Sequence, residues 1–253
     1  DIAFGNVIGS NIANITLVLG VTALIFRVKI SEKTGTLHYP ILLLSSLVFG
    51  GVLYFFGGVP QSIGFSFVFL LLIYTWMLIR KSRKDNLKTE NDENKLLEEA
   101  SGNSLIKSLG VLIVGIILLK FGADCLVEGA IDIAKKFEIS ERVIAVTVVA
   151  IGTSIPELAT SIVAAFKKEH NLAIGNLIGS NIFNILLILG VVASVKEITL
   201  ADTAIFSFDY VWMIIITFVL GLFIYVFSKH RISRIEGILL LLIYIAYLYF
   251  SIY

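Results

Sequence analysis

The sequence predicts an all-helical polytopic membrane protein built as an inverted-topology repeat. Three observations lead to this prediction. Hydrophobic residues make up 57% of the chain and charged residues 15%, and the mean hydropathy is +0.94, outside the range of ordinary soluble domains. The apolar residues gather in runs of about 20, the length of a membrane-spanning helix. A sequence motif with several polar residues, which we call the phrase, occurs twice, beginning at Gly5 and at Gly175.

About eight runs reach this length, and we expect each of them to cross the bilayer as a helix. Helices are favoured over barrel strands because the runs are long and lack an alternation of period two. In chain order, the expected spans cover approximately residues 3–26, 40–58, 61–78, 104–131, 143–166, 173–195, 210–227 and 235–250. The first and sixth contain the two copies of the phrase, and the fifth contains Glu157.

The one long polar stretch, residues 80–103, divides the chain into halves at 1–79 and 104–253. Lysine and arginine gather here and in the connections after residues 26, 166 and 227. These connections lie on one side of the expected spans, which we place in the cytoplasm. Residues 80–103 are therefore expected to form a cytoplasmic linker, with RKSRK at its start as an alternative contact for anionic lipid headgroups.

The repeated phrase reads GNVIGSNIANITLVLGV from Gly5 and GNLIGSNIFNILLILGV from Gly175, with 13 identical residues in 17 positions. The copies lie in the first and sixth expected spans, an odd offset, so they enter the membrane from opposite sides. This arrangement is typical of secondary transporters that place a substrate site near the middle of the bilayer.

Each copy carries polar side chains that a lipid-facing helix does not need. Ser10 and Asn14 are four residues apart and share one helix face, and Ser180 and Asn184 repeat the pattern. Polar groups at this depth must be satisfied within the protein, by water or by an ion. The glycines of the phrase have a small-xxx-small spacing, for which we favour close helix packing over a direct role in the site.

Glu157 lies within the apolar stretch VVAIGTSIPELATS. An ionisable group at membrane depth is a candidate functional residue, although buried structural glutamates also exist. Pro156 removes the helical partner of the Gly152 carbonyl, and Thr153 and Ser154 add hydroxyl oxygens within one turn of Glu157. A set of hard oxygen ligands without cysteine or histidine points to calcium or sodium.

GTSIPE followed by GNLIGSNIFN, with the echo GNVIGSNIAN, resembles the alpha repeats of the sodium/calcium exchangers, within the prokaryotic branch of the calcium/cation antiporter superfamily. KFGADCLVEGAIDIAKKFEIS resembles the stretch before the second repeat, so the resemblance covers nearly the whole chain. It implies ten helices in two inverted halves of five, with ion sites at the centre. The family's first repeat has its own glutamate helix before GNVIGSN, so we expect the first two helices to be missing from residues 1–79.

The resemblance also implies which residues hold the ions. Glu157 corresponds to the second-repeat carboxylate, with Thr153 and Ser154 as hydroxyl companions and the Ala150 carbonyl as a sodium ligand. The remaining residues that it implies are Ser10, Asn14, Ser180 and Asn184. Because some relatives carry aspartate where Asn184 stands, the asparagine argues mildly against a requirement for potassium.

The predicted function is an antiporter, and not an enzyme, that exchanges Ca²⁺ for Na⁺ by alternating access in a prokaryotic cell membrane. The ions are transported, and no organic cofactor is expected. The expected partners are the lipid bilayer, the two ions and the missing N-terminal helices of the same protein, with no nucleic acid. A Ca²⁺/H⁺ antiporter and, with less support, an uncoupled cation channel remain as alternatives.

Overall fold

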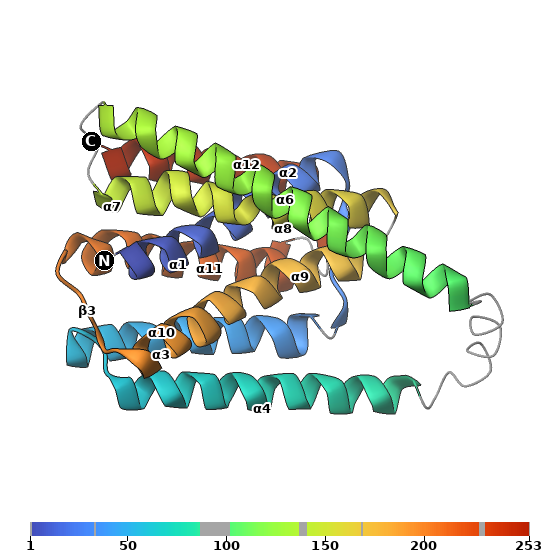
Figure 1. Cartoon of the computed structure of the whole chain (residues 1–253), viewed down its shortest axis with the longest axis horizontal. Coiled ribbons are helices and arrows are strands. Elements are labelled where there is room, and N and C mark those ends of the chain that lie inside the picture. Colours follow the sequence, from blue (N-terminus) through green and yellow to red (C-terminus); the bar gives the residue numbers. More distant parts are fainter. Residues whose placement is uncertain are drawn as a thin grey trace.

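A computed structural model describes residues 2–32, 34–86, 102–136, 141–167, 169–227 and 231–252. The described part is a bundle of helices, with α4 and α6 at opposite edges (Figure 1). Of the expected linker, 80–86 continue a helix, and 87–101 lie outside the described residues.

The helices and strands fall into two series separated by residues 87–101. The first series is α1 Ile2–Ala13, the π-helical segment η1 Asn14–Val18, α2 Leu19–Ile25, β1 Val28–Lys29, η2 Thr34–His38, α3 Tyr39–Phe56, β2 Gly58–Val59 and α4 Gln61–Asn86. The second is α6 Gly102–Lys136, α7 Glu141–Ile144, η3 Ala145–Val149, α8 Ala150–Phe166, α9 His170–Phe183, η4 Asn184–Leu189, α10 Gly190–Val195, β3 Ile198–Thr199, η5 Ile205–Tyr210, α11 Val211–Leu222, η6 Phe223–Phe227, β4 Arg231–Ile232 and α12 Arg234–Ile252.

The prediction of eight spans is confirmed, because the described residues contain 8 helices long and apolar enough to cross a membrane. Two of them begin earlier than expected, at Thr34 instead of residue 40 and at Ile205 instead of residue 210. In both, a π-helical segment precedes the α-helix. Pro40 lies in the first turn of α3, where its missing N–H leaves no helical hydrogen bond unmade, so the helical path runs through it.

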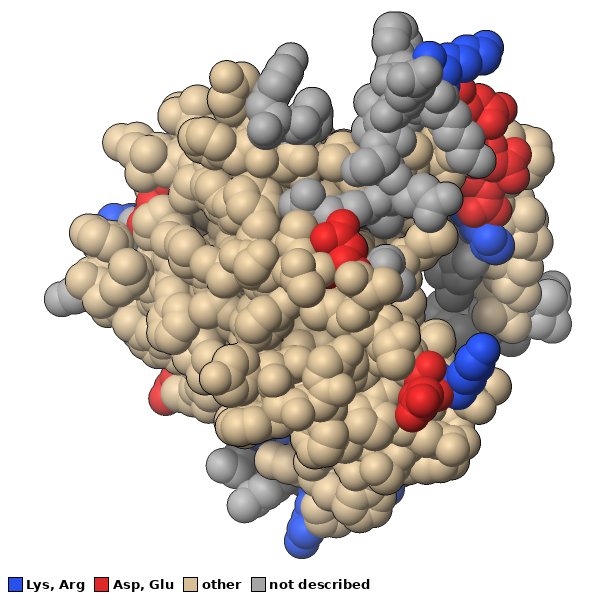
Figure 2. Space-filling view, turned by 90° about the vertical axis from the view of Figure 1, so that its left-hand side faces the viewer, with Lys and Arg blue, Asp and Glu red and all other residues tan. Residues whose placement is uncertain are grey.

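Large apolar side chains cover much of the outer surface. Phe55, Phe121 and Val195 are among those that are exposed, as expected for side chains that face lipid tails. On the end of the bundle in Figure 2, most of the surface is uncharged, and the charged side chains gather mainly in small groups on the right of the view. Burial in lipid therefore accounts for surface that would be unfavourable in water.

The two halves of the chain are joined at both ends of the bundle by short antiparallel strand pairs. Strand β1 pairs with β4, with Val28 opposite Ile232, and β2 pairs with β3, with Val59 opposite Ile198. Each pair takes one strand from each half. Two inverted copies of one unit are expected to make the same contact twice, once at each end of the bundle.

The helices that follow the repeated phrases also cross between the halves. Helix α12 packs against α2, and α10 packs against α4. At these crossings the backbones approach so closely that a Cβ on Gly64 would lie 2.6 Å from the Ser194 nitrogen, and one on Gly237 would lie 2.9 Å from the Gly20 carbonyl oxygen. Close approach at small residues is a main source of helix association in membranes.

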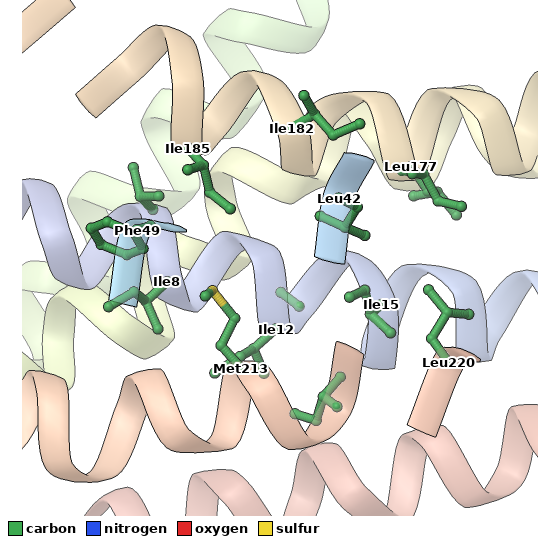
Figure 3. Close-up of a cluster of buried hydrophobic side chains, with 14 of the residues drawn as sticks. Ile8, Ile12, Ile15, Leu42, Phe49, Leu177, Ile182, Ile185, Met213 and Leu220 are labelled. Atoms are coloured by element: carbon green, nitrogen blue, oxygen red, sulfur yellow. The ribbon is translucent and has the colours of Figure 1, made fainter. Parts of the chain in front are cut away.

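The buried apolar core lies around α1, the helix of the first phrase. Its side chains meet those of α3, α9, η4 and α11 (Figure 3). The residues labelled there are Ile8, Ile12, Ile15, Leu42, Phe49, Leu177, Ile182, Ile185, Met213 and Leu220. The first phrase thus packs against helices of the second half, α9 and α11, as well as against α3 of its own half.

Candidate functional site

Helix α8 carries the acidic residue of the site and continues as an α-helix through Pro156. Oxygen Oε2 of Glu157 and the Ser154 hydroxyl oxygen are buried and have no hydrogen-bond partner among the described residues. Leaving such groups unpaired in a protein interior is unfavourable. Unpaired oxygens of this kind are suited to bind a cation.

Glu157 lines a cavity of about 390 Å³ with residues of α9 and the first residue of η4. The cavity brings together three predicted site residues, Glu157, Ser180 and Asn184. It also contains Gly175 and Gly179. Carboxylate, hydroxyl and carboxamide oxygens are the ligands that hard cations prefer.

Two other predicted residues of α8, Thr153 and Ala150, lie against α1. The Ser10 and Thr153 hydroxyl oxygens are 2.6 Å apart, and the Thr153 hydroxyl also donates to the Ala150 carbonyl oxygen at 3.1 Å. Asn6 Oδ1 lies 3.4 Å from both hydroxyl oxygens. Ser10, Thr153 and Ala150 therefore form one hydrogen-bonded group, to which sequence reasoning did not assign Asn6.

Thr153 also lines a second cavity, of about 540 Å³, between α6 and α8. On α6 the Lys120 Nζ lies 2.8 Å from the Asp124 carboxylate, and both side chains are largely exposed. The two cavities are lined by different residues of α8. The predicted site residues thus do not all line a single cavity.

Four asparagines of the two phrases form a hydrogen-bonded network between the halves. Asn14 Nδ2 donates to Asn181 Oδ1 at 2.9 Å, and Asn184 Nδ2 donates to Asn11 Oδ1 at 3.0 Å. Asn14 and Asn184 each begin a π-helical segment, a feature that is frequent at functional sites. Asn11 and Asn181 were not predicted, because the spacing of four residues places only Ser10 with Asn14, and Ser180 with Asn184, on one face. The signal that could have found them is their identity in both copies.

The glycines of the two phrases have different surroundings. A Cβ on Gly9 would lie 2.6 Å from the Val146 carbonyl oxygen, so α1 packs tightly on η3 there. A Cβ on Gly175 or Gly179 would meet no atom of the described part of the chain within 4 Å. The packing expected for this spacing is thus present at Gly9, whereas α9 presents an open face beside Glu157.

The charge of the site comes from very few groups. Within the described residues, no cluster of three or more His, Cys, Asp or Glu side chains could hold a metal ion. In the cavity, Glu157 is the acidic lining residue. The remaining oxygens are neutral, so the arrangement suits a cation that binds weakly and exchanges, more than a permanently bound metal ion.

Comparison with known proteins identifies relatives over nearly the whole chain. Residues 1–80 and 107–253 match the family described as sodium/calcium exchanger protein. The putative antiporter CaxA of Alkalimonas amylolytica is 34% identical over 262 residues, which cover 98% of this chain and 78% of CaxA. The sodium/calcium exchanger MaX1 of Methanosarcina acetivorans is 29% identical over 280 residues, covering 98% and 79%.

The fold is similar to solved structures as well. The sodium-calcium exchanger NCX_Mj, soaked with zero Na⁺ and Ca²⁺, superposes with a TM-score of 0.73 at 31% identity. The match covers 97% of this chain and 75% of NCX_Mj. Fold and sequence thus agree on the same group of proteins.

Proposed function

This chain belongs to the sodium/calcium exchanger family, and we propose that it exchanges Ca²⁺ for Na⁺ across a membrane by alternating access. The observation that carries the proposal is the cavity in which Glu157, Ser180 and Asn184 meet. It lies beside the second of two inverted phrases, where secondary transporters hold their substrates. The substrates are the two ions, and their movement requires no covalent chemistry.

We propose that both ions use overlapping oxygen ligands. Ca²⁺ favours six to eight oxygens, and the Glu157 carboxylate supplies negative charge while neutral oxygens complete the shell. The Ser154 and Asn14 oxygens that are buried without partners support this assignment. Because the ions compete for the same ligands, binding of one excludes the other and couples their movements.

Calcium flux in vesicles that contain the reconstituted protein tests this function. We expect Ca²⁺ uptake to require an outward Na⁺ gradient and to stop when the gradient is abolished, at equal pH on both sides. Uptake driven by a pH gradient without Na⁺ would identify a Ca²⁺/H⁺ antiporter. Uptake that continues without any counter-ion would identify a channel. Either outcome would contradict the proposal.

We also propose that another helix pair of the same protein packs on the open face of α9. The support comes from the comparison of the phrases: Gly9 packs against η3, and its counterpart Gly179 faces open space. A helix there could bring a second carboxylate to the cavity. One carboxylate alone balances a divalent ion poorly in a medium of low dielectric constant.

Photocrosslinking in the full-length protein tests the helix contact. Phe183 lines the cavity beside this face, and we replace it with p-benzoylphenylalanine. We expect crosslinks to a segment outside residues 1–253. Phe55, which is 79% exposed, is the control position, and there we expect crosslinks to lipid. Crosslinks from position 183 that reach only lipid or residues 1–253 would contradict the contact.

For the change in access, we propose that α6 moves against α8. The principal contacts of α6 are with α8 and η3, and few residues of its membrane-spanning window are buried. Movement of an element with so few contacts disrupts little packing. We further propose that residues 1–79 and 104–253 act as the two halves, joined by 80–103.

A further inference from the structure

Of the four networked asparagines, Asn184 lines the cavity that contains Glu157, whereas Asn11, Asn14 and Asn181 are not among its lining residues. We infer that Asn11 and Asn181 are positioning residues, which turn the carboxamide oxygens of Asn14 and Asn184 toward the bound cation. The inference rests on the proposed function of the site. The identity of an asparagine ligand does not define its orientation, because either the oxygen or the NH₂ group of the side chain can face the ion.

The hydrogen bonds define which end of each carboxamide is used. Asn181 Oδ1 accepts from Asn14 Nδ2, and Asn11 Oδ1 accepts from Asn184 Nδ2. Each bond joins one phrase to the other, and the two bonds are equivalent in the repeat. The NH₂ groups of Asn14 and Asn184 are therefore directed away from the ion, and their oxygens are left for binding.

Asn11 and Asn181 are themselves held in one orientation. Asn11 Nδ2 donates to the Asn181 carbonyl oxygen at 3.4 Å, and Asn181 Nδ2 donates to the Asn11 carbonyl oxygen at 3.3 Å. If either carboxamide turned over, it would lose this bond and present NH₂ to the NH₂ of its partner. The reciprocal side-chain to backbone bonds thus determine that Oδ1 is the end that meets Asn14 or Asn184.

Burial makes it costly for these carboxamides to turn over. Asn11 and Asn181 are 1% and 0% exposed, and Asn14 is 1% exposed. Because these side chains are almost inaccessible to solvent, water does not replace a hydrogen bond that they lose. Oxygen Oδ1 of Asn14 is buried and finds no partner within the described ranges, in a segment that packs against α8, the helix of Glu157. This unpaired oxygen is the end of the Asn14 carboxamide that the hydrogen-bond network leaves for the cation.

Equilibrium binding of radioactive Ca²⁺ to the purified full-length protein tests this role through combined substitutions. We expect Asn181→Leu to weaken binding about tenfold, the value of one good hydrogen bond. In an Asn14→Ala background, the same substitution should change binding less than about twofold, since Asn181 acts through Asn14. Asn11→Leu should still weaken binding about tenfold in that background, because it acts through Asn184.

Thr16→Val is the matched control. The Thr16 hydroxyl is fully buried on η1 and bonds the Ile12 carbonyl oxygen at 2.6 Å, so its loss perturbs the same segment without touching the carboxamides. We expect Ca²⁺ binding to change less than about twofold. An equal effect of Asn181→Leu with and without Asn14 would show a general structural role and overturn the inference.

Asn181→Asp provides a test that does not require the leucine variant to fold. Aspartate keeps an oxygen for Asn14 Nδ2, replaces the donor to the Asn11 carbonyl with a second oxygen, and adds a negative charge when it is ionised. We expect Ca²⁺ binding as tight as in the parent or tighter, and weaker binding would overturn the inference. Failure of the parent itself to bind Ca²⁺ would overturn the proposed function and this inference together. If the parent binds Ca²⁺ but the effects of Asn181→Leu and Asn14→Ala are additive, this inference alone is overturned.

Discussion

Replacing Glu157 with glutamine is expected to weaken Ca²⁺ binding by about 100-fold or more. The substitution keeps the shape and one oxygen of the side chain but removes the charge. In the cavity, Glu157 is the acidic residue among the described lining side chains, and none of the others there can take over its charge. Equilibrium Ca²⁺ binding measures the loss, and Na⁺-dependent uptake into vesicles should fall with it.

Glu197→Gln is the control for this prediction. Glu197 is an exposed carboxylate between α10 and β3, and its neutralisation removes the same charge from the protein away from the cavity. We expect Ca²⁺ binding to change less than about twofold, because exposed charges are screened by water and salt. Retained affinity in Glu157→Gln, or an equal loss in both variants, would show that the assignment of Glu157 as a ligand is wrong.

Gly64→Ala is expected to lower the free energy of unfolding by about 2 kcal/mol. Alanine normally stabilises a helix relative to glycine, but here the added Cβ would lie 2.6 Å from the Ser194 nitrogen. That atom belongs to the backbone of α10, so the helices must separate for the methyl group to fit. Reversible unfolding in detergent, followed by circular dichroism, measures the change.

Gly51→Ala is the matched substitution for Gly64→Ala. Gly51 lies within α3, and a Cβ there meets no described atom within 4 Å. We expect the stability to be unchanged or to rise by up to about 1 kcal/mol, because helix propensity then acts without a clash. If both variants shift stability in the same direction, the close crossing of α4 and α10 does not hold these helices together.

The positions of the membrane spans could be predicted because hydrophobic runs and helix length are local properties. Errors arose where the apolar pattern was interrupted. The second span was placed at Pro40 onward, but the helical path begins at Thr34. Sequence patterns of period 3.6 do not identify π-helical segments such as η2 and η5, in which the register shifts.

The candidate site was predicted less completely. Glu157 and Ser180 were expected in one site and line one cavity. Thr153, four residues before Glu157, contacts Ser10 and lines a different cavity. Spacing along a helix places residues on a face, but the direction of each side chain depends on what packs against that face.

The sequence by itself determined that the protein crosses a membrane with helices, that it contains two copies of one phrase in opposite orientations, and that candidate oxygen ligands and one glutamate accompany them. These properties follow from composition, period and spacing. Only the tertiary structure decided how the copies meet. It paired Asn14 with Asn181 and Asn184 with Asn11, and left the Gly179 face open. The physical reason is that hydrogen-bond partners 167 and 173 residues apart are chosen by packing between the halves, which no local pattern contains.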